Sequence, residues 1–179
     1  MQCAVEQPKF NDEISEIILP NEKVDKVVFT VGSVLRGDDA AGPLLAKKVN
    51  DDPVAGWTLI EGDQTPENEL GYIKRLAPKF LLLVDAAEMG LNAGEVRVLR
   101  GDDVERKYLF TTHSMPITYL LGQLKDSCEE VLFLGIQPQN TDFFGPVTPE
   151  VREAVEKIYY ALNSEDDLKE LKAFKFLAE

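Results

Sequence analysis

Three groups of polar residues follow apolar or loop segments of this chain and could take part in chemistry. Asp38 and Asp39 follow the apolar residues 27–31 after a short segment that begins at Gly32 and ends at Gly37. Asp85 ends the most apolar stretch of the sequence, and His113, the single histidine, precedes a segment with helical spacing. Two carboxylates and an imidazole suit zinc, nickel, iron or manganese, and three protein ligands leave coordination positions open. The residue types do not select among these metals.

Each of these residues also has a structural interpretation. An aspartate before a first helical turn accepts backbone N–H bonds and suits the helix dipole, which would explain one of Asp38 and Asp39. Asp85 could likewise cap a turn, and a lone histidine such as His113 often braces a loop. For Asp85 we favour function, because carboxylates at the carboxyl end of a buried strand lie where open α/β sheets place their sites.

Several other chemistries are poorly supported. A hydrolase triad is not indicated, because the chain has one histidine and no G-x-S-x-G motif. Residues 32–37 have the glycine spacing of a phosphate-binding loop, but Asp38 and Asp39 follow where such a loop needs lysine and serine or threonine. The two carboxylates would repel a phosphate. The dinucleotide motif G-x-G-x-x-G is absent from the sequence.

Composition narrows the class of protein further. The 179 residues suit one domain, and the formal charge of 19 − 32 = −13 argues against nucleic-acid binding and against adsorption to anionic lipid. Cys3 and Cys128 do not form a C-x-x-C pair, so neither a disulfide framework nor a zinc ribbon is indicated. With no signal-like start and no stretch long enough to span a membrane, we expect a cytoplasmic protein.

Apolar runs and helical spacings alternate along the chain. The predicted strands are residues 27–31, 57–61, 80–85, 94–99 and 131–136, and the predicted helices are 40–50, 65–77, 116–125 and 148–162, with Thr65 as a helix cap. Residues 80–84 are continuously apolar, as in a central parallel strand, whereas 94–99 alternate as in an edge strand. We expect a single α/β domain, with a doubly wound five-stranded sheet, one antiparallel edge strand and helices on both faces.

The expected domain covers residues 25–163. Residues 1–24 are predicted to be an N-terminal extension and residues 164–179 a charged C-terminal tail with a short apolar patch.

Several sequence blocks, taken in their order and spacing, resemble the hydrogenase maturation endopeptidases. These enzymes trim a C-terminal extension from the large subunit of nickel-iron hydrogenases. The resemblance spans roughly residues 26–160 and is greatest for the subgroup that serves formate-hydrogenlyase-type and related membrane-bound hydrogenases. The blocks are Val31-Gly32-Ser33 with Gly37-Asp38-Asp39, Thr65-Pro66-Glu67-Asn68, Val84-Asp85-Ala86 with Met89-Gly90-Leu91, Thr112-His113-Ser114-Met115-Pro116, and Phe133-Leu134-Gly135-Ile136-Gln137-Pro138.

The resemblance implies a specific site. The metal-binding triad of the family maps onto Asp39, Asp85 and His113, and its aspartic-type assignment makes Asp39 and Asp85 the catalytic carboxylates. Asp39 is favoured over Asp38 because it is the more helix-proximal position in the family pattern. The metal is the nickel already held by the substrate, so no tightly bound resident cofactor is expected. The implied partner is the large-subunit precursor, and we expect a monomer without nucleic acid or membrane insertion.

The chain departs from the family pattern at two positions. Ser33 stands where the family usually has asparagine, and Ala40 where it has glycine. Serine can still form a hydrogen bond in the loop. Alanine is acceptable provided that the backbone there does not need a positive φ, as at a helix start.

Two other functions stay open at this stage. One is a non-catalytic metal-binding maturation chaperone, which would bind nickel without shortening a precursor. The other is a receiver-type phospho-acceptor domain, which also carries acidic residues after its first and third strands. The receiver interpretation is disfavoured because Asp38 and Asp39 follow a loop and because Gln137 stands where a receiver needs lysine.

Overall fold

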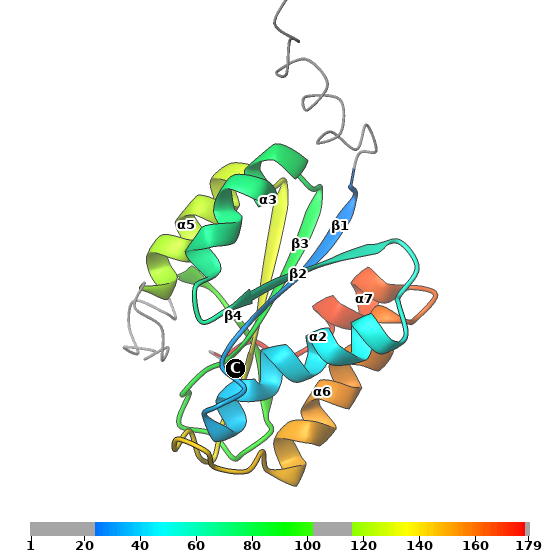
Figure 1. Ribbon diagram of the computed structural model, residues 1–179. Helices are drawn as coiled ribbons and strands as arrows, with labels where there is room; N and C mark the ends of the chain where they lie inside the picture. Colours follow the sequence, from blue (N-terminus) through cyan, green and yellow to red (C-terminus); the bar gives the residue numbers. More distant parts are fainter. Residues whose placement is uncertain (1–23, 102–115, 178–179) are drawn as a thin grey trace, which may run out of the picture.

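The computed structural model describes residues 24–101 and 116–177, in which strands and helices alternate along the chain (Figure 1). The strands are β1 (Lys26–Val31), β2 (Trp57–Asp63), β3 (Phe80–Ala86), β4 (Val96–Leu99) and β5 (Glu130–Ile136). The α-helices are α2 (Ala41–Asp51), α3 (Leu70–Leu76), α5 (Ile117–Ser127), α6 (Pro149–Leu162) and α7 (Asp167–Lys172). Two 3₁₀ turns precede α2 and α3, namely η1 (Gly37–Ala40) and η2 (Pro66–Glu69).

The strands form one five-stranded sheet in the order β2-β1-β3-β5-β4. Strand β1 is parallel to β2 and to β3, β3 is parallel to β5, and β4 is antiparallel to β5. The predicted fold class is therefore confirmed, including the antiparallel edge strand. The connection after β1 leads to β2 at one edge of the sheet, and the connection after the adjacent strand β3 leads to β4 at the other edge. The carboxyl ends of β1 and β3 therefore form the topological switch point at which open α/β sheets place a ligand crevice.

Helices cover both faces of the sheet (Figure 1). The strand side chains alternate between the two resulting cores. Every residue of β3 is buried, as predicted for a central parallel strand. Beneath α2, α6 and α7 lie Val28, Leu82, Val84, Leu134 and Ile136. Beneath α3 and α5 lie Val27, Phe29, Leu81, Leu83 and Phe133.

The helix starts differ in detail from the sequence prediction. The segment predicted to start a helix at Thr65 opens with the 3₁₀ turn η2, and no side-chain hydrogen bond from Thr65 caps it. The Thr65 hydroxyl instead accepts a hydrogen bond from the Asn68 side chain at 3.2 Å. Helix α3 ends at Leu76 because Ala77 takes a left-handed conformation with φ 43°, and Pro78 then prevents a further turn.

Part of the segment predicted as a charged tail packs on the domain. Leu171 of α7 is fully buried in the core beneath α6, and Phe176 forms a parallel bridge with Val98 on the outer edge of β4. This bridge occupies the amide and the carbonyl of Val98, two backbone groups that could otherwise pair with another chain. The predicted N-terminal extension lies outside the described residues, apart from Val24. Among the residues that are described, no helix is long and apolar enough to cross a membrane.

A polar cluster joins the two ends of the domain. The Lys26 ammonium forms an ion pair with Asp167 of α7, and the Trp57 indole donates to the same carboxylate at 2.8 Å. Burial favours a raised pKa for Asp167, but the Lys26 and Trp57 hydrogen bonds and the Lys26 charge outweigh burial, so the pKa lies below its ordinary value of 3.8. Because the folded state lowers this pKa, the cluster stabilises the protein above about pH 4 and loses its effect as the pH falls through the folded-state pKa.

We therefore expect Asp167→Asn to lower the free energy of unfolding at pH 7 by about 1–3 kcal/mol, since it leaves Lys26 without its charged partner. The difference from the unmodified protein shrinks below about pH 4. Urea unfolding at pH 7 and at pH 3 measures both values. The matched control is Asp51→Asn, which removes an ion pair with Lys47 whose side chains are 68% and 64% exposed, and which should change stability by less than about 0.5 kcal/mol. An equal loss in both variants would contradict the assignment.

Candidate functional site

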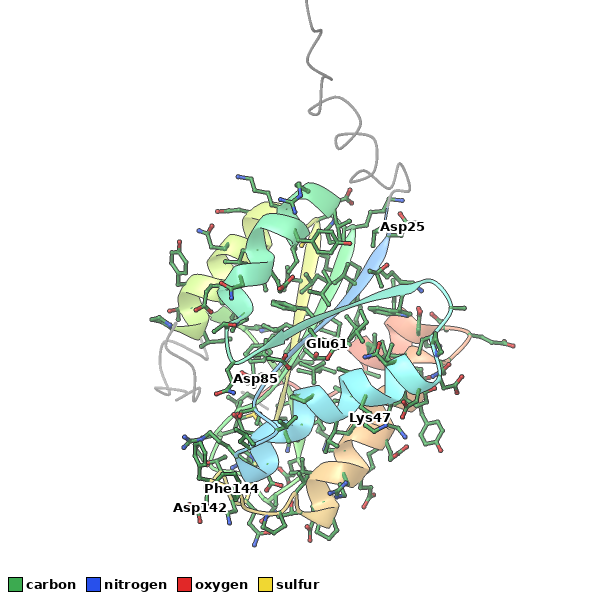
Figure 2. The ribbon with its side chains drawn as sticks, in the orientation of Figure 1. Asp25, Lys47, Glu61, Asp85, Asp142 and Phe144 are labelled. Carbon is green, nitrogen blue, oxygen red and sulfur yellow. The ribbon has the colours of Figure 1, made fainter. Side chains whose placement is uncertain are left out.

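Asp85 lies at the carboxyl end of the central strand β3, as the sequence predicts. The residue is fully buried and aligns with Gly135 of β5. By the alternation of the strand, its side chain is on the same face as Leu81 and Leu83, the face covered by α3 and α5. Figure 2 shows Asp85 well away from Asp25, which precedes β1 at the other end of the sheet.

Asp39 reaches the same edge of the sheet from the neighbouring strand β1. It lies in η1, which contacts β3, and it is 2% exposed. The loop that carries it closes through a hydrogen bond of 3.0 Å from the Ser33 amide to the Asp39 carbonyl. Gly32 makes this closure possible, since its φ is 146° and a Cβ there would lie 2.1 Å from the Asp39 carbonyl oxygen. The structure thus brings Asp39 and Asp85 to the switch point between β1 and β3.

Asp38 has a different environment from Asp39. Its carboxylate accepts hydrogen bonds from the amides of Gln139 at 2.8 Å, Asn140 at 3.1 Å and Thr148 at 2.7 Å, and from the Thr148 hydroxyl at 3.2 Å. The helix-capping interpretation of Asp38 is wrong, because no side-chain hydrogen bond caps η1 or α2. This carboxylate instead joins the loop after β1 to the loop between β5 and α6.

Both departures from the family pattern are compatible with the local structure. The Ser33 hydroxyl accepts a hydrogen bond from the Leu35 amide at 3.3 Å, as expected for a serine in this loop. Ala40 has a φ of −74° at the start of α2, so no glycine is needed there.

Gln137 organises the segment that follows Asp85, a role that the sequence analysis missed. It is 3% exposed, and its side-chain oxygen accepts hydrogen bonds from the amides of Met89 at 2.7 Å and Leu91 at 3.2 Å. Its side-chain nitrogen donates to the Glu88 carboxylate at 3.0 Å. The sequence block around Gln137 could be recognised, but its hydrogen-bond partners lie nearly fifty residues earlier in the chain. No local sequence pattern therefore indicated these bonds.

His113, the third predicted ligand, lies outside the described residues. The described chain resumes at Pro116, and α5 ends at Ser127, close to the start of β5 at Glu130. Since α5 therefore runs back along the sheet for about 16 Å, Pro116 lies toward the carboxyl edge, where Asp39 and Asp85 are. In the parts of the chain that the structure describes, no group of three or more histidine, cysteine or acidic residues could hold a metal ion.

The environment of Cys128 does not favour a cysteine nucleophile. Burial raises the pKa of this thiol to about 11, so it stays protonated at neutral pH. Cys128 also follows the end of α5, close to the start of β5 and hence at the opposite end of the sheet from Asp85. Cys3 lies outside the described residues.

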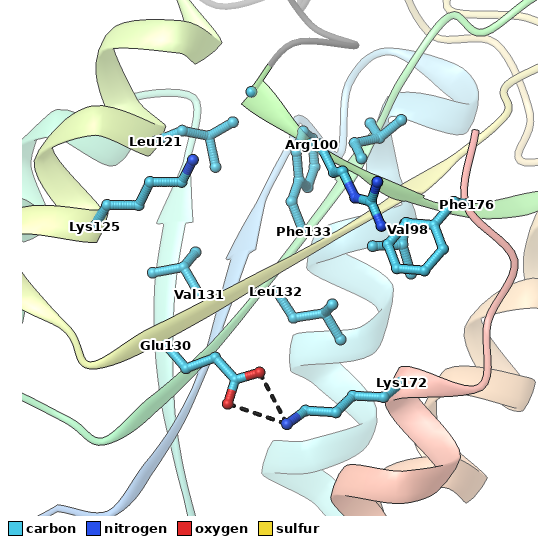
Figure 3. A pocket seen from close by; sticks show the side chains of 12 residues that line it. Val98, Arg100, Leu121, Lys125, Glu130, Val131, Leu132, Phe133, Lys172 and Phe176 are labelled. Atoms are coloured by element: carbon cyan, nitrogen blue, oxygen red, sulfur yellow. Dashed lines mark hydrogen bonds and ion pairs between the residues drawn. The ribbon is translucent and has the colours of Figure 1, made fainter. Parts of the chain in front are cut away.

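A cavity of about 530 Å³ also lies away from the two carboxylates (Figure 3). It is lined in part by Arg100, Lys125 and an ion pair between Glu130 and Lys172 at 2.8 Å. Glu130 is the first residue of β5 and aligns with Phe80, the first residue of β3. The cavity therefore belongs to the edge where the parallel strands begin and is not part of the candidate site.

The bonding of Asp38 predicts a structural effect of its substitution. In Asp38→Asn the amide nitrogen replaces one acceptor oxygen, so backbone donors become unsatisfied and the free energy of unfolding falls by about 2–4 kcal/mol. Thermal or urea unfolding measures this loss. The matched control in the same loop is Asp142→Asn, whose side chain is exposed and which should change stability by less than about 0.5 kcal/mol. Equal stability of Asp38→Asn and the unmodified protein would refute the bridging role.

Comparison with known proteins gives consistent matches. Residues 43–165 match the family model for hydrogenase maturation proteases of the HycI type. The chain is 46% identical to the hydrogenase 3 maturation protease of Escherichia coli over 136 residues, which cover 76% of this chain and 87% of that protein. It is 30% identical over 148 residues to a putative hydrogenase maturation protease of Methanocaldococcus jannaschii, covering 76% of this chain and 85% of the relative.

Solved structures agree with these matches. The solution structure of the endopeptidase HycI from Escherichia coli superposes with a TM-score of 0.78 at 42% identity, covering 86% of this chain and 96% of that one. A crystal structure of a hydrogenase 3 maturation protease superposes with a TM-score of 0.77 at 42% identity, covering 87% and 98% of the two chains. The resemblance deduced from the sequence blocks is thereby confirmed, and the chain belongs to the HycI family of hydrogenase maturation proteases.

Proposed function

We propose that this protein is an endopeptidase that removes the C-terminal extension of a nickel-iron hydrogenase large-subunit precursor after nickel has been inserted. The observation that carries the proposal is the position of two buried carboxylates, Asp39 and Asp85, at the switch point of the sheet in a member of this protease family. In open α/β sheets, ligands bind at the carboxyl ends of the strands that flank such a switch point.

Recognition of the precursor depends on the nickel that it carries. Asp39, Asp85 and His113 supply two carboxylates and an imidazole, which are suitable donors for nickel. Three protein ligands leave coordination positions for groups of the precursor itself. The metal is part of the substrate and no resident cofactor is needed. A precursor without nickel lacks this metal link to the carboxylates, and the protease thereby tests for nickel insertion before it cuts.

In the hydrolytic step, one of the two aspartates has a second role besides binding nickel. Asp39 or Asp85 acts as general base and takes a proton from a water molecule, whose oxygen attacks the carbonyl carbon of the scissile peptide. The carbon–nitrogen bond then breaks, and the proton passes to the leaving amine. This is the aspartic-type chemistry implied for the family. We place the reaction in the cytoplasm, with a monomer acting on one precursor molecule.

A first experiment compares nickel-loaded and nickel-free precursor. After incubation with the protease, mass spectrometry should show loss of the C-terminal extension from the loaded precursor only. Unchanged mass in the loaded sample, together with nickel binding by the isolated protein, would favour the maturation chaperone and reject the protease.

A second experiment separates metal recognition from bond cleavage. Asp39→Asn, Asp85→Asn and His113→Gln should each lower the rate of cleavage by about 10²–10⁴-fold, since each removes a nickel ligand or the general base. Nickel-dependent binding of the precursor is measured in parallel. A variant that binds normally but does not cut identifies the base, whereas loss of both identifies a ligand.

The matched control for these variants is Asp63→Asn. Asp63 ends β2 at the same edge of the sheet, is exposed, and has a φ of 45°, which asparagine tolerates. The substitution removes one negative charge from this edge without touching the proposed ligands. Cleavage at the normal rate is expected, and a loss as large as that of Asp85→Asn would show that net charge, not ligation, governs activity.

A further inference from the structure

Two loops near the candidate site expose large apolar side chains. Val34 and Leu35, between β1 and η1, are 72% and 42% exposed, and Phe143 and Phe144, between β5 and α6, are 58% and 80% exposed. We call these two segments, residues 34–36 and 142–145, the apolar loop pair. Figure 2 shows Phe144 and Asp142 at the end of the molecule at which α2 and α6 begin. Contiguous exposed apolar groups of this kind mark interaction surfaces.

The apolar loop pair is held in a defined geometry. The Phe144 amide donates to the Leu35 carbonyl at 2.7 Å, which ties one loop to the other. The rings of Phe143 and Phe144 meet edge to face at 5.1 Å, and the Arg36 guanidinium lies 5.5 Å from the centre of the Phe143 ring. The Asp38 bridge fixes the base of both loops. The surface is therefore formed before any partner binds, which reduces the entropic cost of binding.

The backbone of Phe144 adds a second observation. Its φ is 58°, in the left-handed region that bulky residues rarely adopt. Glycine or asparagine would occupy this position at lower conformational cost. With an 80% exposed ring, the aromatic side chain gains little from packing within the domain. An exposed aromatic residue kept in a strained conformation indicates a use outside folding.

The apolar loop pair lies close to the candidate site, because few residues separate it from Asp39. Leu35 precedes Asp39 by four residues, and an extended chain spans at most about 3.6 Å per residue, so the two residues lie within about 14 Å. A polypeptide with its scissile bond at Asp39 and Asp85 extends for several residues on each side of that bond. It therefore has to pass over the neighbouring surface.

Arg36 supplies a polar contact within this apolar surface. The residue is half-buried, and its guanidinium, which lies beside the Phe143 ring, has several N–H donors and no acceptor. A peptide carbonyl that passes over the two loops can accept a hydrogen bond from one of these donors. The combination of apolar side chains and one donor fits an extended peptide with apolar residues.

We propose that the apolar loop pair binds an apolar segment of the precursor polypeptide next to its scissile bond. The apolar side chains of the segment pack on Val34, Leu35, Phe143 and Phe144, and one of its carbonyl oxygens accepts a hydrogen bond from Arg36. This inference rests on the proposed function and adds to it a determinant of specificity that is independent of nickel. The carboxylates and the nickel align the bond, and the apolar loop pair selects the polypeptide.

The test uses Phe144→Asn and Phe143→Ser in the full-length protein with nickel-loaded precursor. Asparagine tolerates the positive φ of Phe144, so the thermal midpoint should stay within about 2 °C of the unmodified protein. Each variant should raise KM about tenfold or more and leave kcat within about twofold, because burial of an aromatic side chain accounts for at least that difference in affinity. The control is Tyr160→Ser on α6, which removes an aromatic residue that is 67% exposed and should change neither constant.

The outcomes distinguish this inference from the proposed function. If the unmodified protein cuts the loaded precursor and both phenylalanine variants keep its KM, the docking role is overturned and the protease stands. If the unmodified protein does not cut, the protease is rejected, and calorimetric binding of the precursor decides the inference. Tighter binding by the unmodified protein than by Phe144→Asn supports the apolar loop pair. Equal affinity, or no binding by either, overturns it.

Discussion

The carboxylate of Asp38 is the interaction on which the carboxyl edge of this protein depends. The carboxylate accepts hydrogen bonds from Gln139 in the loop after β5 and from Thr148, the residue before α6. The backbone amide of Asp38 in turn donates to the Asn140 carbonyl at 2.8 Å. A carboxylate withdrawn from water is stable only when such donors replace its hydration. Because Asp39 is the next residue, its position is set by the same bonds. The hydrogen bonds of Asp38 also position the loop after β5, which carries the exposed Phe143 and Phe144.

Two neighbouring aspartates thus have separate tasks. Asp38 holds two loops together, and Asp39 lies beside β3 at the switch point, together with Asp85. The bonds of Asp38 account for a sequence feature that helix capping does not explain, namely two consecutive carboxylates before one helix. Gln137 acts in a similar way after β5, where it holds the segment that follows Asp85.

The sequence predicted those features that arise from local patterns. Unbroken apolar residues in β3 predicted a strand covered on both faces, and the alternation before Leu99 predicted an edge strand, because burial imposes these periods. The position of Asp85 followed directly. The role of Asp38 could not be predicted, since its partners lie 101 to 110 residues further along the chain. The packing of α7 was missed for a related reason, because charged residues surround the one side chain, Leu171, that is fully buried there.

The pairing of Lys26 with Asp167 has a consequence for how this chain acquires its fold. The two residues are 141 positions apart, so the first strand gains its last polar partner only when nearly the whole domain is available. Contacts of such long sequence separation slow folding, because the entropy of closing a large loop is lost before the contact forms. During synthesis, β1 leaves the ribosome before α7 does. The bond between Lys26 and Asp167 therefore forms only after α7 has been made, and a chain that ends before α7 lacks it.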